Sequence, residues 1–106
     1  MPKYLITASY SADGAKGVLS SGGTARRSAV EESVAKLGGS LESFYFAFGK
    51  ADAFVVVDLP DNVAAAALGL QVGASGMAAT RTVVLLTPEE VDQAAAAPHT
   101  YRPPGS

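Results

Sequence analysis

Apolar residues recur along this chain in two patterns, one typical of β-strands and one typical of α-helices. Four stretches rich in aliphatic and aromatic residues predict strands, and they are residues 3–10, 41–48, 53–59 and 77–87. Two other stretches, residues 24–37 and 62–73, repeat apolar or small residues at helical spacing. A short helix is also expected around residues 13–20.

Turn and capping residues separate these elements. Thr24 is the expected N-cap of the helix over residues 24–37, and Gly38 ends it. Asp61 is the expected N-cap of the next helix, and Thr87 with Pro88 begins one more helical turn. In the helix over residues 62–73, the expected buried stripe consists of Val63, Ala66, Ala67 and Leu70.

The order strand, helix, strand, strand, helix, strand predicts an α+β, ferredoxin-like βαββαβ fold. We expect a four-stranded antiparallel sheet in the order 4-1-3-2, with both helices on one face. The expected domain spans residues 1–93, and residues 94–106 form a flexible Ala/Pro-rich C-terminal tail.

Both faces of the predicted sheet are apolar, although two helices can cover only one of them. We therefore expect a second copy of the chain to cover the other face. That face is expected to include some of Leu5, Thr7, Phe44, Phe46, Phe54 and Val56. In the first strand, we favour the side that carries Thr7 and Ser9 as the one that faces away from the helices. There are two alternatives. The central strands could be apolar on both faces within a monomer, or the segment after Thr87 could cover the second face of the sheet.

Composition narrows the functional classes. The 106 residues contain no cysteine and carry a formal net charge of −2, which removes disulfides and thiolate chemistry and gives no basic footprint for nucleic acid. The N-terminal stretch lacks the long apolar core of a signal peptide, and no stretch approaches the length of a membrane helix. A soluble, cytoplasmic domain without a metal or other cofactor is expected. The only histidine, His99, lies in the tail, where haem ligation or Ser/His catalysis is not expected.

Two short motifs stand out: the turn Phe48-Gly49-Lys50-Ala51-Asp52 and the helix start Pro60-Asp61. With them, the chain from about Lys3 to Glu90 resembles the GYD-domain family. Gly49 and Asp52 match the family's Gly-x-Tyr-Asp turn, and Pro60-Asp61 matches its Pro-Asp helix start. Ala51 replaces the tyrosine that gives the family its name, so any role of that tyrosine is lost. The resemblance implies the dimeric α/β-barrel group, whose members include cofactor-free monooxygenases, haem-degrading enzymes and isomerases. It implies no particular activity.

Candidate ligand-binding residues are scattered over the predicted sheet. The charged turn at Gly49–Asp52 is interpreted as a hairpin bend in which Asp52 bonds neighbouring backbone amides, with a pocket-capping role as the alternative. Asp58 is a candidate base if buried, and Arg81 a candidate anion ligand that could equally pair with Asp58. The full set of candidates is Ser9, Tyr10, Tyr45, Asp52, Asp58 and Arg81.

Arg26 and Arg27 begin a predicted helix after two glycines. An anion could bind the free amides there, but the stretch lacks the spaced pattern of a phosphate-binding loop. We favour a solvated arginine face, with Glu31 pairing with Arg27 four residues earlier.

Two functions are therefore expected from the sequence. The first is a homo-oligomeric domain that binds a small apolar or anionic molecule or scaffolds a partner. The alternative is a cofactor-independent enzyme of the monooxygenase, cyclase or isomerase type, acting on a small aromatic or polyketide-like substrate. In that case Tyr10 and Tyr45 supply apolar walls and Asp52 or Asp58 supplies the base. A closed pocket with a convergent polar group favours the enzyme.

Overall fold

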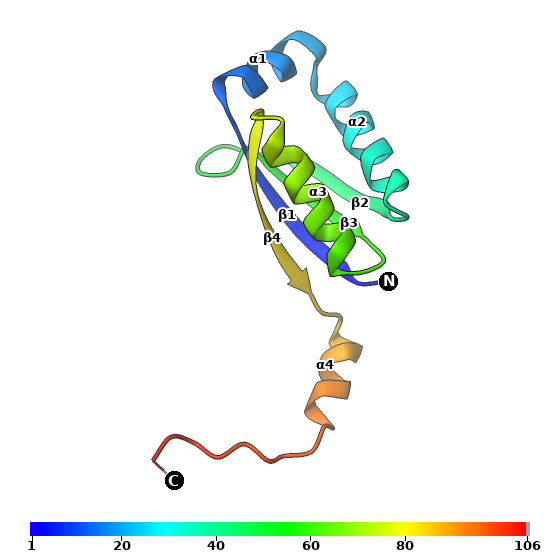
Figure 1. The fold of residues 1–106 in the computed structure, drawn as a ribbon, viewed down its shortest axis with the longest axis vertical. Helices are drawn as coiled ribbons and strands as arrows, with labels where there is room; N and C mark the ends of the chain where they lie inside the picture. The colour runs from blue at the N-terminus through cyan, green and yellow to red at the C-terminus, as the bar shows by residue number, and fades with distance from the viewer. Residues whose placement is uncertain (106) are drawn as a thin grey trace.

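The computed structural model describes residues 1–105 and contains four strands and four helices in these residues (Figure 1). The strands are β1 (Lys3–Tyr10), β2 (Ser40–Phe46), β3 (Ala53–Asp58) and β4 (Ala78–Leu85). The helices are α1 (Ala12–Ser21), α2 (Gly23–Lys36), α3 (Asn62–Ala74) and α4 (Pro88–Ala95).

The four strands form one antiparallel sheet in the order β2-β3-β1-β4, which confirms the predicted order. Helix α2 packs against β2, and α3 packs against β4. Val34 of α2 and Leu68 of α3 share one buried cluster with residues of β1 and β3, so both helices cover the same face. The fold is therefore α+β with the ferredoxin-like arrangement. Helix α1 is an addition that contacts α2 and β1.

The core lies between the sheet and these two helices. Its largest fully buried side chains are Tyr4, Val34, Val57 and Leu59. The Tyr4 hydroxyl donates a hydrogen bond of 2.7 Å to Oδ1 of Asn62, at the start of α3. This bond satisfies the polar end of a tyrosine whose ring is otherwise in the apolar core.

Local capping signals place most helix ends. Asp61 accepts a hydrogen bond from the Ala64 backbone N–H at 2.9 Å, as an N-cap does. Gly38 follows the last turn of α2 with φ +84°, a conformation that glycine adopts without strain. The prediction for Thr24 is wrong, because α2 begins one residue earlier and its N-cap is Gly22.

The expected buried stripe of α3 is also wrong. Val63 and Leu70 are 76% and 74% exposed, whereas Ala65 and Leu68 are buried. Helix α3 is apolar around its whole circumference, so its sequence does not indicate which side faces the sheet. Packing against the sheet selects the side that carries Ala65 and Leu68.

The centre of the sheet face away from the helices is mostly apolar, and the residues of that face follow from the strand register. Residues that lie opposite one another in paired strands share a face. Leu5 lies opposite Val56 and Val83, and Thr7 lies opposite Phe54 and Arg81. We call this surface the open face; it carries Leu5, Thr7, Tyr45, Phe54, Val56, Arg81 and Val83. The side of β1 that carries Thr7 and Ser9 therefore faces away from the helices, as predicted.

Two phenylalanines expected on that face lie on the other side. Phe44 is opposite the buried Val55, and Phe46 is opposite the buried Ala53. The register of β2 shifts between Leu41 and Ser43, so Leu41 faces the helices together with Phe44 instead of alternating with it. Beyond an irregularity of this kind, the side chains of the strand point to the opposite face of the sheet from the one that simple alternation predicts.

Helix α4 and the residues after it lead away from the sheet (Figure 1). Every residue of α4 is exposed, and the described residues extend over 57 × 31 × 22 Å. The segment after Thr87 therefore does not cover the open face of its own chain.

Candidate functional site

A pocket lies between the sheet and helices α2 and α3, with a cavity of about 110 Å³. All four strands and both helices contribute to its wall. Most of the lining is apolar, and the residues are Ile6, Ala8, Tyr10, Arg26, Ala29, Val30, Ser33, Phe44, Ala53, Val55, Leu68, Gly69, Val72, Thr80 and Thr82. An apolar cavity with a few polar groups is the usual form of a small-molecule site.

Arg26 carries the only charge among these lining residues. Its guanidinium carbon lies 5.8 Å from the centroid of the Tyr10 ring, in cation–π geometry. Its Nε is buried and has no hydrogen-bond partner. The pocket thus combines an apolar body with one cation that has no hydrogen-bond partner on its Nε.

Tyr10 is held by the charged turn between β2 and β3. The Tyr10 backbone N–H donates to Oδ2 of Asp52 at 2.8 Å. The Asp52 backbone N–H donates to the carbonyl of Ala8 at 2.7 Å, and its own carbonyl accepts from Ala47 at 2.8 Å. Asp52 therefore bonds an amide far away in the sequence, not its neighbours as expected. The turn fastens the end of β1, and Asp52 does not line the pocket.

Ser9 and Arg81 lie on the opposite side of the sheet from the pocket. They line a groove together with Thr7, Lys50, Ala51, Ala79 and Thr80. The Ser9 hydroxyl donates to the Lys50 carbonyl at 2.6 Å, which fastens the turn a second time. Ala51, at the position of the family's tyrosine, borders this groove, so a larger side chain there would extend over the open face.

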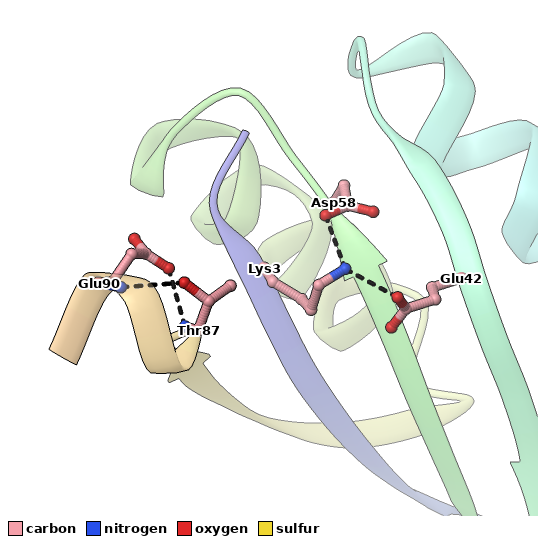
Figure 2. A network of polar contacts seen from close by, with 5 residues as sticks. All are labelled: Lys3, Glu42, Asp58, Thr87 and Glu90. Carbon is pink, nitrogen blue, oxygen red and sulfur yellow. Dashed lines mark hydrogen bonds and ion pairs between the residues drawn. The ribbon is translucent and has the colours of Figure 1, made fainter. Parts of the chain in front are cut away.

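Tyr45 and Asp58 also face away from the pocket. Tyr45 is 70% exposed and lies opposite Phe54 on the open face. Asp58 accepts from the ammonium of Lys3 at 3.0 Å, and Glu42 accepts from the same ammonium at 2.9 Å (Figure 2). These hydrogen bonds, first that to Glu42 and then that to Asp58, raise the pKa of Lys3 above 10.5. Asp58 is thus paired with Lys3 and not with Arg81.

The structure therefore brings only one of the six predicted residues, Tyr10, into the pocket. The role of the other five in binding stays a prediction. Arg26 was missed because it was assigned to a solvated face. On α2 the ion pair in this structure joins Glu32 and Lys36 at 3.2 Å, not Arg27 and Glu31. The spacing Arg26, Ala29, Val30, Ser33 follows the helical apolar stripe, and that signal places Arg26 on the inner side.

Residues 1–105 contain no group of three side chains of the kinds that ligate metals close enough to hold an ion. None of the helices in this part of the chain has the length and apolar character needed to span a membrane. The cytoplasmic location stays a prediction.

Fold and pocket together define the class of protein: an α+β domain with a ferredoxin-like sheet and a small apolar pocket beneath two helices. The chain belongs to the GYD domain family, whose model matches residues 4–95. The resemblance seen in the sequence is therefore confirmed, and the match includes all of α4. The comparisons with curated proteins and with solved structures found no match. Membership in this family carries no specific role, and the division of the chain at residue 93 stays a prediction.

Proposed function

We propose that this chain is a homo-oligomeric domain that binds a small molecule in the pocket between the sheet and helices α2 and α3. The observation that carries the proposal is the pocket itself, in which an apolar wall surrounds Arg26, Tyr10, Ser33, Thr80 and Thr82. A few convergent polar groups in an apolar cavity fix the orientation of a ligand, while the apolar wall supplies most of its affinity.

Binding is supported over catalysis by what lines the pocket. No carboxylate and no histidine is among its lining residues in the described part of the chain. Asp52 holds the end of β1, and Asp58 pairs with Lys3. The two candidate bases of the enzyme alternative therefore lie outside the pocket, and a general base must reach its proton within hydrogen-bond distance.

The proposed oligomer rests on the open face. Phe54 is 41% exposed there, Val83 50% and Tyr45 70%. Tyr45 lies opposite Phe54, and Val83 lies opposite Leu5 of the intervening strand β1. Helix α4 of the same chain leads away from the sheet (Figure 1). A second copy packed sheet against sheet would remove on the order of 800 Å² from water on each partner, the size of an ordinary stable interface.

Two glycines of α3 allow the pocket to be tested directly. Gly69 lines the pocket, and a Cβ built on it has ordinary contact with Thr80. Gly73 lies one turn later, and a Cβ there meets nothing. Gly69→Leu should fill the cavity, whereas Gly73→Leu changes the helix equally but leaves the cavity free.

The measurement is a screen of small aromatic and aliphatic fragments by saturation-transfer NMR. Fragments that bind the wild type and Gly73→Leu should fail to bind Gly69→Leu. If no fragment binds the wild type, or if the bound fragments remain on Gly69→Leu, the pocket is not a ligand site and the proposal is wrong.

A further inference from the structure

We infer that the ligand of this pocket is a small apolar carboxylic acid whose carboxylate pairs with Arg26. This inference rests on the proposed function, because it names the chemical class of molecule that the same pocket takes. It is argued from the charge of the wall, the unused donor on Arg26 and the size of the cavity.

The charge of the wall is uncompensated. Arg26 is the one charged residue among those that line the pocket, and its side chain forms no ion pair within the described part of the chain. Asp13 lines a neighbouring hollow between α1 and α2 that Arg26 also borders, but the two side chains do not form an ion pair. An anion in the pocket would supply the missing charge.

The donor on Arg26 is specific in its geometry. Its buried Nε carries an N–H without an acceptor, and such a group has lost its water without gaining a partner. The Tyr10 ring contacts the guanidinium at 5.8 Å and uses its π face, not its donors. The terminal nitrogens of the guanidinium are not buried in this way, and they offer two parallel N–H groups that match the two oxygens of a carboxylate.

The apolar part of the wall determines the size and character of the uncharged part of the ligand. Ile6, Phe44, Val55, Leu68 and Val72 are apolar and surround the cavity. Its volume is about 110 Å³, and a cavity of about 150 Å³ in another protein holds a benzene ring. The buried part of the ligand is therefore no larger than about one six-membered ring or a short branched chain. A small aromatic or branched aliphatic acid fits both the Arg26 cation and the apolar wall of the pocket.

The test compares benzoate with benzyl alcohol, which has a similar shape and no charge, and extends the acids to phenylacetate and isovalerate. Dissociation constants come from ¹H–¹⁵N titrations at constant ionic strength. Arg26→Gln removes the cation from the pocket. Arg27→Gln is the matched control, because it removes the same charge from the next residue of α2, which is exposed and does not line the pocket.

We expect the wild type and Arg27→Gln to bind at least one acid about tenfold more tightly than benzyl alcohol, and Arg26→Gln to lose that preference. If benzyl alcohol binds as well as every acid, or if Arg26→Gln keeps the preference, the inference is wrong. It is also wrong if no acid binds at millimolar concentration. In each of these cases the proposed function survives when neutral fragments still bind the wild type and are lost in Gly69→Leu.

Discussion

At Gly14, helix α1 lies against the backbone just before β4. The Met77 carbonyl accepts hydrogen bonds from the Ser11 backbone N–H and hydroxyl at 2.9 and 3.1 Å. A Cβ on Gly14 would overlap this same carbonyl, whereas a Cβ on Gly17, in the same helix, meets nothing. Position 14 of α1 therefore has room for glycine only.

Gly14→Ala should lower the free energy of unfolding by about 1–3 kcal/mol, because backbone must move to admit the methyl group. Gly17→Ala should leave it unchanged or raise it by up to ~1 kcal/mol, through better helix propensity. Urea denaturation of both variants measures the difference. Equal effects of the two substitutions would show that α1 does not pack on Met77 as described.

Lys3 gives the fold a dependence on alkaline pH. Its pKa is raised by hydrogen bonds to Glu42 and Asp58, so its contribution to stability is present below its ordinary value of 10.5. That contribution is lost as the pH rises through the raised pKa of the folded state. The wild type should exceed Lys3→Gln in urea midpoint near neutral pH, and the gap should close above pH 10.5.

The exposed Lys16 provides the control for this prediction, since it has no ion pair with any residue up to 105. Lys16→Gln should run parallel to the wild type at every pH, which separates the effect of Lys3 from other effects of alkaline pH. A gap between the wild type and Lys3→Gln that stays constant into the alkaline range would contradict the assignment.

Helix α4 is stabilised by its cap and not by packing. The Thr87 hydroxyl accepts from the Glu90 backbone N–H at 3.1 Å, and Oε1 of Glu90 accepts from the Thr87 backbone N–H at 2.9 Å (Figure 2). All eight residues of α4 are exposed, and isolated helices shorter than about 12 residues are marginal in water. Its formation therefore depends strongly on this capping box.

Thr87→Ala should remove about 1 kcal/mol from the local stability of α4. The ¹³Cα chemical shifts of residues 88–95 should move toward random-coil values, while the thermal midpoint of the domain stays unchanged. Thr100→Ala, in the exposed C-terminal segment, is the control and should alter neither quantity. A lower thermal midpoint for Thr87→Ala would mean that α4 packs against a partner in solution.

At the scale of the whole molecule, the proposed assembly depends on the open face. Phe54→Glu places a charge in the middle of that face, where Phe54 lies opposite both Thr7 and Tyr45. We expect the variant to stay folded and its dimer to dissociate more than about tenfold more easily than that of the wild type, because an interface core does not tolerate an unpaired charge. Phe46→Glu is not a suitable variant, since Phe46 faces the helices.

Leu70→Glu is the matched control, because Leu70 is 74% exposed on α3, on the other side of the sheet. Light scattering at micromolar concentration should give a dimer for the wild type and Leu70→Glu and a monomer for Phe54→Glu. A folded wild-type monomer at that concentration, or a dimer that survives Phe54→Glu, would show that the open face is not the interface.

The sequence by itself determined the elements and their order, because alternation, helical spacing and capping are local properties. Asp61 and Thr87 cap the helices that they were predicted to cap. The sheet order followed as well, since two crossover helices on one face leave few topologies open. The outward parity of β1 was also correct, because Thr7 and Ser9 marked its more polar side.

The tertiary structure alone decided which side of each ambiguous element is buried. Helix α3 is apolar all round and β2 contains a register shift, so neither the exposed Leu70 nor the inward Leu41 and Phe44 follow from spacing. The hydrogen bond from Tyr10 to Asp52 joins residues 42 positions apart, beyond the reach of any local pattern. The pocket likewise exists only once α2 is packed on the sheet. That packing turns Arg26 from a residue expected on a solvated face into the one cation of an apolar wall, with its Nε buried and unpaired.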